Sequence, residues 1–597
     1  MQITERLSAF RARMEQENMA VVIVPTADSH ASEYLAEHFK TRQWLCGFTG
    51  SAGTLVIGLH EAALFTDGRY FIQAERQLAG SGVSLMRMGT EGTPSIAEYV
   101  SGLAGPGESC GVDFSVVSAH FAADLSDTLA SREIALRDTG DWFDGLWADR
   151  PAMPQGKVFL LDEQYAGMGI AEKLSATRRI MAACGASVHV NNVLDDIAWT
   201  LNVRGSDVLN TPVVMSYLLV GEESAVWFVD QKKVGEDVAA ALTAAGVYLR
   251  DYDEIEHALD AIEPGTGVLV DGKKLTARLC AALAEANIIQ HENPAFRLKA
   301  IKNDVELDNL RKAHIRDGLA VTRLMYWLKQ NAGKEPMTEL SITSRLLGLR
   351  KEQPHFISSS FDTICAYREN AAMMHYKATE ESNAVVENRD LLLIDSGAQY
   401  LEGTTDITRT FAMGEVTPEQ KKHFTAVLCG MLNLQNARFL HGCTGIGLDI
   451  LARGPMWDLG IDYRCGTGHG VGYLLSVHEG PNSFRWYKSA ARNEDTVMEA
   501  GMVTTDEPGI YIEGSHGIRL ENELVCRKLE CGEYGQFMGF EAITCAPIDL
   551  DAVVPEQMTA RQRAWLNEYH AFVRENLTDL MANDDERAWL AHATRAI

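Results

Sequence analysis

Residues 391–397 read LLLIDSG, and residues 404–410 read TTDITRT. The first segment is a continuous apolar run, which predicts a buried strand ending at Asp395. The second segment predicts another strand, because it is rich in β-branched residues. If the two strands form a hairpin that turns near Tyr400 and Leu401, Asp395 and Asp406 lie roughly opposite each other. Two carboxylates held so close repel each other and need a cation between them.

Three more candidate ligands follow these two aspartates. His469 lies in GTGHGVG at residues 466–472, where small neighbours let other groups approach closely. Glu507 precedes a Pro-Gly pair, and Glu521 ends the strand-like segment GIRLE. Each signal is weak alone, and the hypothesis rests on their order and context. Four carboxylates and one imidazole suit Mn, Fe or Co, with Zn also acceptable. Two divalent ions would balance four carboxylates, and such a pair can share a water and lower its pKa.

Other chemical motifs fail on inspection. The glycine-rich run at residues 466–472 has Val471 where a dinucleotide-binding motif needs its third glycine, and it lacks the Gly-Lys-Ser/Thr ending of a P-loop. No H-E-x-x-H sequence is present. Nucleotide binding and zincin-type proteolysis are therefore not predicted.

Composition narrows the class of protein. The chain has 597 residues, which suggests three or four domains, and its formal net charge of −28 disfavours nucleic acid and anionic membranes as partners. No apolar run approaches the roughly 20 residues of a membrane span. The N-terminus shows no secretory signal, and the eleven cysteines are scattered without a C-x-x-C. A cytoplasmic location is the expectation.

The order of apolar runs predicts two α/β regions, at residues 1–150 and 151–301, and a third domain at 302–597 that opens with a long helix. The expected helices and strands of the first region are a helix at 4–17 and strands at 19–24, 54–58 and 62–66. Those of the second are a strand at 158–161, a helix at 170–184 and strands at 213–220, 225–229 and 267–270. The two regions share a coarse rhythm, which hints at a duplicated unit. Long helices are expected at 302–328 and 559–581.

The ordered motifs DSG, DITRT, GTGHGVG, EPG and GIRLE resemble those of the dinuclear pita-bread metallopeptidases, which include methionine aminopeptidase, prolidase and aminopeptidase P. Residues 28–30, 47–53 and 66–70 resemble the first domain of the long cytosolic-type aminopeptidase P, and residues 194–199 resemble its second domain. Methionine aminopeptidases lack both N-terminal domains and prolidases usually carry one, so three domains favour Xaa-Pro aminopeptidase. The resemblance implies two creatinase-like N-terminal α/β domains followed by an α+β pita-bread catalytic domain.

The resemblance also implies a ligand set. Asp395 would bind one metal, His469 and Glu507 the other, and Asp406 and Glu521 would bridge two divalent ions. Manganese is the first expectation, with cobalt, zinc or iron left open. A bridging hydroxide would attack the carbonyl between any N-terminal residue and a following proline, with Glu507 shuttling the proton.

Other site residues follow from the same resemblance. His375 and His478 are expected around the scissile bond, where they position substrate and stabilise the oxyanion. Tyr511 and Arg519 match positions that orient the ligands, although a structural ion pair explains Arg519 nearly as well. Cys465 stands where the family commonly has histidine, which puts proton handling or substrate preference in doubt but not the metal site.

Alternatives remain open at this point. A prolidase-like dipeptidase would differ by rejecting residues beyond the proline. A non-catalytic peptide-binding module typically loses metal ligands, and a metal-free creatinase-type enzyme lacks this ligand set, whereas all five are present here. The expected partners are peptides with proline in the second position. The resemblance also implies a homodimer.

Overall fold

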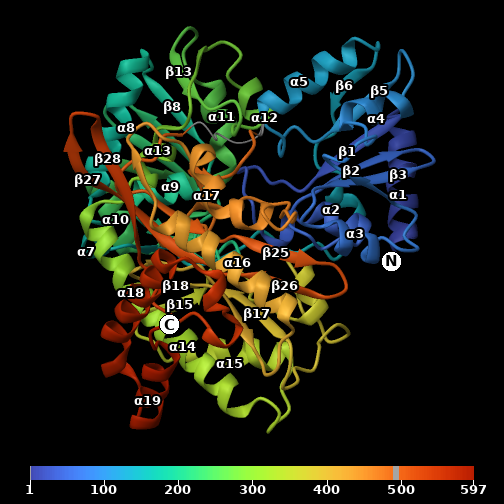
Figure 1. Cartoon of the computed structure of the whole chain (residues 1–597). Helices are drawn as coiled ribbons and strands as arrows, with labels where there is room; N and C mark the ends of the chain where they lie inside the picture. The colour runs from blue at the N-terminus through green and yellow to red at the C-terminus, as the bar shows by residue number, and fades with distance from the viewer. Residues whose placement is uncertain (1, 489–495) are drawn as a thin grey trace. The chain divides into compact units, whose positions relative to one another are not determined.

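The computed structural model describes residues 2–488 and 496–597, which form two compact units. The first unit consists of Met1–Asp162 and Met168–Ala295, and the second consists of Glu163–Gly167 and Phe296–Ile597 (Figure 1). The three-domain division at residues 150 and 301 stays a prediction.

The first unit is built around two six-stranded mixed sheets, with helices and the short pair β7 (Phe159–Leu160) and β9 (Val203–Arg204) beside them. The first has the order β4-β3-β2-β1-β5-β6. Its strands are β1 (Val21–Pro25), β2 (Thr54–Gly58), β3 (Ala62–Thr66), β4 (Ser84–Arg87), β5 (Ser109–Val112) and β6 (Ala135–Asp138). The second has the order β12-β11-β10-β8-β13-β14. Its strands are β8 (Val188–Asn191), β10 (Ser216–Gly221), β11 (Ala225–Val229), β12 (Val247–Arg250), β13 (Gly267–Val270) and β14 (Asn287–Gln290).

The two sheets have the same topology. Along each sheet, the first pairing is parallel and the next two are antiparallel. The last three strands are parallel to one another. The internal duplication suggested by the sequence is therefore present in the strand order and direction.

The central strand β1 explains why its sequence is a continuous apolar run. Val22 and Val24 belong to one apolar core, which also contains Leu7 of helix α1 (Ile3–Gln16). Val21 and Ile23 belong to another core on the opposite face of the sheet. Because both faces are covered, the strand has no polar side.

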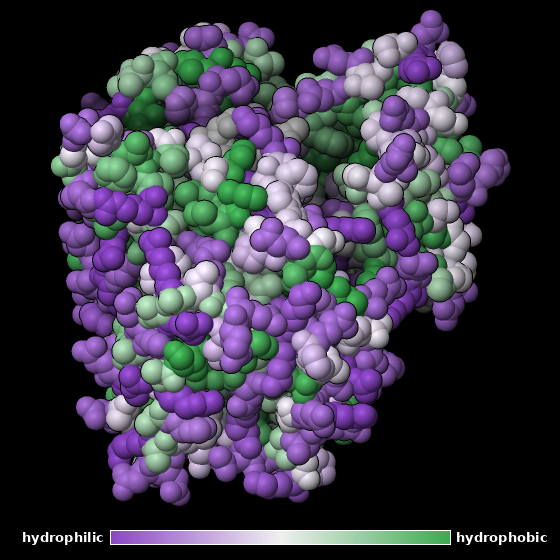
Figure 2. All heavy atoms as spheres, in the orientation of Figure 1, coloured by the Kyte–Doolittle hydropathy of each residue, from purple (hydrophilic) through white to green (hydrophobic). Residues whose placement is uncertain are grey.

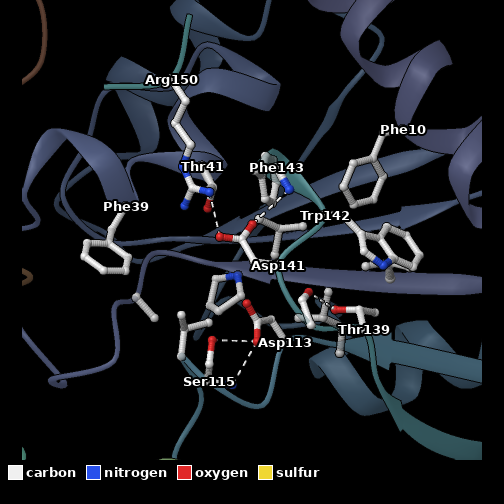
Figure 3. A pocket seen from close by; sticks show the side chains of 17 residues that line it. Phe10, Phe39, Thr41, Asp113, Ser115, Thr139, Asp141, Trp142, Phe143 and Arg150 are labelled. Carbon is white, nitrogen blue, oxygen red and sulfur yellow. Dashed lines mark hydrogen bonds and ion pairs between the residues drawn. The ribbon is translucent and has the colours of Figure 1, made fainter. Parts of the chain in front are cut away.

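A hollow lies at the carboxyl ends of β1, β5 and β6 (Figure 3). Its polar lining includes Asp113, which accepts hydrogen bonds from Ser115, and Asp141, whose carboxylate pairs with Arg150 at 2.6 Å. None of the site residues predicted from the sequence lines this hollow.

In the described part of the second unit there are four sheets, with orders β16-β17-β20, β15-β18-β19, β21-β28-β27-β24-β22-β23 and β25-β26. Their strands are β15 (Phe356–Ser359), β16 (Ile364–Tyr367), β17 (Leu391–Ser396), β18 (Ala398–Tyr400), β19 (Gly403–Thr404), β20 (Ile407–Ala412), β21 (Arg438–Leu440), β22 (Gly468–Gly470), β23 (Glu479–Phe484), β24 (Val503–Asp506), β25 (Gly509–Ile512), β26 (His516–Arg519), β27 (Asn522–Gly532) and β28 (Gly535–Ala542).

Long helices accompany these sheets. They are α14 (Asp304–Asn331), α15 (Glu339–Lys351), α16 (Pro418–Gln435), α17 (Gly445–Trp457), α18 (Ala560–Leu577) and α19 (Asp584–Ala593). Helix α14 begins where Asn303 and Glu306 form a reciprocal capping box, and it lies beside α15 (Figure 1). Phe424 of α16 and Leu566 of α18 share the largest apolar core of this unit. Both predicted long helices are therefore present, with ends shifted by a few residues.

Across residues 2–488 and 496–597, none of the helices is long and apolar enough to cross a membrane. The face of the second unit around α14, α15 and α19 is mainly hydrophilic in the view of Figure 2.

Candidate metal centre

The predicted hairpin is present and carries the two aspartates. Strands β17 and β20 pair antiparallel, with Asp395 opposite Thr408 and Ser396 opposite Ile407. The predicted strand at residues 404–410 is interrupted at Thr405 and Asp406, between β19 and β20. Because Asp406 lies two residues before Thr408, it is the diagonal neighbour of Asp395 on the same face. The two carboxylates therefore point to one side, although they are not directly opposite.

The interruption gives the backbone of Asp406 a new partner. Its N–H donates to Glu523 Oε1 at 2.7 Å, in place of a bond to a neighbouring strand. Glu523 is fully buried, and its other oxygen lies 3.2 Å from His314 Nε2 of α14. This contact fixes the Asp406 backbone from β27.

His469 is held in the short strand β22 between two glycines. A Cβ at Gly468 would lie 1.8 Å from the Thr505 carbonyl oxygen, and one at Gly470 would lie 2.3 Å from that of Glu479. Only glycine permits such close strands. The Nδ1 atom of His469 lies 2.9 Å from its neighbour's carbonyl oxygen, O of Gly470. With the ring proton on Nδ1, Nε2 has a lone pair for a cation.

Carboxylates surround that lone pair. His469 Nε2 lies 3.5 Å from Asp406 Oδ2 and 3.3 Å from Glu507 Oε1. Glu507 follows β24, and its backbone N–H donates to the Thr467 carbonyl at 2.8 Å. Ligand atoms of Asp406, His469 and Glu521 lie within 4.8 Å of one another. The structure thus gathers four of the five predicted ligands around one point.

Arg519 connects the fifth predicted ligand to the others. Its Nη2 donates to Asp395 Oδ2 at 2.5 Å, and its Nε lies 3.9 Å from Glu507 Oε2. Its Nη1 donates to the Tyr511 hydroxyl at 2.6 Å. Arg519 therefore forms a buried ion pair with a candidate ligand, and its part in orienting that ligand stays a prediction.

The donor set fits divalent cations. Asp395 Oδ1 and Glu521 Oε1 are buried and accept no hydrogen bond within the part of the chain that the structure describes. Burial, together with the neighbouring carboxylates, raises the pKa of Asp406 and Glu521 well above their usual ranges, and burial raises the pKa of Glu507 to about 7. Carboxylates crowded in this way without enough positive charge are what bound cations would relieve.

The two other predicted histidines lie in loops. His478 directly precedes β23, and its ring centroid lies 4.3 Å from that of His469, with the rings nearly perpendicular at 84°. His375 follows the 3₁₀ helix η4 (Arg368–Ala372), and the preceding carbonyl, that of Met374, accepts from Arg519 Nη2 at 3.4 Å.

Cys465 lies in the loop that leads to β22. Burial, and secondarily the carboxylate of Glu507, raises the pKa of its thiol to about 12. The neutral thiol cannot supply the charge of an imidazolium at this position.

Sequence reasoning missed two residues that hold the candidate ligands. Thr408 Oγ1 donates to Glu521 Oε2 at 2.7 Å and accepts from Arg519 Nε at 3.2 Å. Glu523 holds Asp406, and its position two residues after Glu521 in a strand-like segment was the available signal. Thr408 carried no signal beyond its place in the DITRT motif.

Comparison with known protein families matches nearly the whole chain. Residues 308–528 match metallopeptidase family M24, and residues 536–597 match the C-terminal region of that family. Residues 6–146 and 149–306 each match the creatinase/prolidase N-terminal domain.

Similar proteins cover the same length. Aminopeptidase P2 of Arabidopsis thaliana is 37% identical, with 100% of this chain and 89% of that protein covered. A probable Xaa-Pro aminopeptidase P of Aspergillus oryzae is 37% identical over 100% of this chain and 93% of its own. The crystal structure of X-prolyl aminopeptidase from Caenorhabditis elegans, described as a cytosolic enzyme with a di-nuclear active site, has a TM-score of 0.95 at 30% identity, with 100% of both chains covered.

Proposed function

Since the chain belongs to metallopeptidase family M24, within the group of the full-length Xaa-Pro aminopeptidases, we propose that it removes any N-terminal residue that precedes a proline. The observation that best supports this proposal is that the ligand atoms of Asp406, His469 and Glu521 lie within 4.8 Å of one another. The chain is also similar over its whole length to proteins named aminopeptidase P.

The proposed ligands of two divalent ions are the five predicted residues, Asp395, Asp406, His469, Glu507 and Glu521. When bound, two such ions lower the pKa of a shared water and polarise the scissile carbonyl. Manganese is proposed first, because carboxylates with one imidazole suit it, although the same donors accept cobalt, zinc or iron. Asp406, His469 and Glu521 would hold one ion together, since their ligand atoms converge.

The chain's own residues would move the proton and orient the peptide. Glu507 would accept the proton of the nucleophile and pass it to the departing proline nitrogen, because its Oε1 faces the candidate metal ligand His469. His478, whose ring contacts that of His469, and His375 would position the peptide and stabilise the oxyanion. Arg519 and Tyr511 would keep Asp395 oriented through their hydrogen bonds.

Similarity along the full length of the chain favours an Xaa-Pro aminopeptidase over a dipeptidase. The Xaa-Pro dipeptidase from Bacillus anthracis covers 65% of this chain at 24% identity, with a TM-score of 0.50, and this likeness shows the fold alone. The aminopeptidases named above match the chain along its full length.

The experiment compares two substrates. Metal-stripped protein is incubated with a Xaa-Pro-Xaa tripeptide and with a Xaa-Pro dipeptide, each with and without Mn²⁺, and release of the first residue is followed. We expect metal-dependent cleavage of the tripeptide, much slower cleavage of the dipeptide, and no cleavage by Asp406→Asn. Cleavage of the dipeptide alone would assign a prolidase, and cleavage of neither would refute the peptidase proposal and leave the peptide-binding module.

The remaining proposals concern the setting of the enzyme. A cytoplasmic location agrees with the description of the Caenorhabditis elegans relative and with eleven free cysteines.

A homodimer is proposed because Trp457, Trp486 and Tyr487 form an exposed aromatic group, with Trp457 and Trp486 ring centroids 5.9 Å apart. Sedimentation should give a dimer for the wild type and a weaker one for Trp486→Ser. The division into domains 1–150, 151–301 and 302–597 is proposed with the matching family regions as support.

A further inference from the structure

Two buried lysines and one buried glutamate meet beside His478. Lys299 Nζ lies 2.9 Å from Glu479 Oε2, and Lys302 Nζ pairs with Glu479 Oε1. The three side chains are only 5%, 1% and 2% exposed, in the order Lys299, Lys302 and Glu479. Burying three charges is costly unless they are closely paired, and two lysines are more than charge balance requires. The second lysine therefore points to a role in fixing the position of Glu479.

The segment 296–302, which contains both lysines, is held at two further points, Gly480 on β23 and Gly501 before β24. A Cβ at Gly480 would lie 2.5 Å from Phe296 Cζ, so this glycine allows the Phe296 ring to lie directly on the strand. The backbone N–H of Lys302 donates to the Gly501 carbonyl at 2.9 Å. One side of Glu479 and Gly480 is thereby fixed.

The other side of Glu479 lies against the strand of the candidate ligand His469. In the pairing of β22 with β23, Gly470 is opposite Glu479 and His469 is opposite Ser483. The residue before Glu479 is His478, whose ring contacts that of His469. A displacement of Glu479 would therefore move His478 relative to His469.

We infer that Lys299 and Lys302 are positioning residues, which hold His478 beside His469 by gripping Glu479. Each carboxylate oxygen of Glu479 has its own ammonium group, so the carboxylate cannot rotate without losing one contact. The consequence for catalysis rests on the proposed function, whereas the placement of the His478 ring does not.

Lys302→Met is the sharpest perturbation. It leaves Lys299 and Glu479 as a neutral pair, so the fold should survive. Because a misplacement of about 1 Å can cost about a hundredfold in rate, we expect kcat on a Xaa-Pro-Xaa tripeptide to fall by at least about tenfold, with little change in KM or Tm. Lys302→Arg should retain most activity.

The matched control is Lys233→Met in the first unit. Lys233 pairs with Asp207 at 2.7 Å, and the side chains are 3% and 0% exposed. Within the described residues, Lys233 is the one lysine that pairs with Asp207, so this variant should lose at least as much stability as Lys302→Met but keep the wild-type kcat. Equal losses of kcat in the two variants would reduce the effect of Lys302 to general destabilisation and overturn the inference.

A double-mutant cycle tests whether Lys302 acts through His478. In the His478→Ala background, Lys302→Met should cause no further loss of kcat. The same fractional loss in both backgrounds would overturn the inference.

A spectroscopic test needs no activity. In protein labelled at the histidine Cε1, the His478 signal is identified by its loss in His478→Ala. We expect Lys302→Met to shift this signal and to leave that of His189, in the first unit, unchanged. An unmoved His478 signal refutes the positioning role, whereas a wild-type protein that cleaves no peptide refutes only the proposed function.

Discussion

Replacing Thr408 by valine should weaken metal binding while preserving the shape of the site. Thr408 is fully buried, and its hydroxyl donates to Glu521 Oε2 at 2.7 Å and accepts from Arg519 Nε at 3.2 Å. Valine fills the same space but makes neither bond. Hydrogen bonds to charged groups contribute about 1.5–3 kcal/mol each. Loss of the one to Glu521 corresponds to roughly a 10–100-fold weaker metal affinity, which is the usual effect of removing a group that orients a ligand.

The assay titrates metal-free protein with Mn²⁺ in a chelator buffer and reports the dissociation constants. Thr408→Ser keeps the hydroxyl and serves as the control, and it should bind Mn²⁺ nearly as tightly as the wild type. If Thr408→Val binds as tightly as Thr408→Ser, the hydroxyl does not orient Glu521 and the reasoning fails. A loss of affinity in both variants would show that the methyl group, which serine lacks, contributes in addition to the hydroxyl.

Three further predictions concern the scaffold. Arg409 is buried and donates to several carbonyl oxygens, so Arg409→Lys should lower the free energy of unfolding by about 3 kcal/mol or more in denaturant titrations, because each stranded buried acceptor costs about 1–3 kcal/mol; an unchanged midpoint would contradict this. Burial, followed by nearby arginines, lowers the pKa of His570 to about 3, below its usual 6.5. The unfolded chain then binds more protons between those values, so Tm of the metal-free protein should fall as pH drops from 6.5 towards 3. In His570→Gln, the fall in stability with decreasing pH should be shallower, by an amount that corresponds to up to about one bound proton. An identical slope would show that His570 is protonated in the fold. Gly468→Ala would place a Cβ 1.8 Å from the Thr505 carbonyl oxygen and should abolish activity, whereas Gly447→Ala on α17 meets nothing within 4 Å and should be neutral in the same peptide assay; equal activities would refute the steric argument.

The sequence predicted the fold class correctly, and two creatinase-like α/β domains with a pita-bread catalytic domain are confirmed by the family matches and the solved relative. Strands at 54–58, 62–66 and 225–229 have the expected bounds. Buried strands of this kind carry a strong apolar signal.

Four of the strands missed in the first unit lie at sheet edges. Strands β4, β6 and β14 have only exposed and half-buried residues, and β12 has a single buried one. They form because a neighbouring strand offers free backbone groups, and this tertiary cause leaves little trace in their own residues.

The sequence predicted which candidate ligands would lie close together, but it did not predict the residues that hold them in place. Asp395, Asp406 and His469 were picked out because they lie at strand ends or in a glycine-rich run. In the structure, Asp406 and His469 are neighbours, and Asp395 is connected to the group by Arg519. Lys302 and His314 lie far from these motifs in sequence, and only the folded chain brings them to Glu479 and Glu523.

The pairing of β17 with β20 makes the length of the segment between them part of the chemistry. Side chains along a strand alternate between faces, so a shift of one residue in this pairing would turn Asp395 and Asp406 to opposite sides of the sheet. Between the two aspartates, a substitution and a change in segment length should therefore have different effects. A replacement in residues 397–405 keeps this alternation, although a side chain at Gly397 does not fit, because its Cβ would lie 1.9 Å from the Thr405 carbonyl oxygen. A single insertion or deletion, by contrast, would separate the two carboxylates even if every ligand were retained.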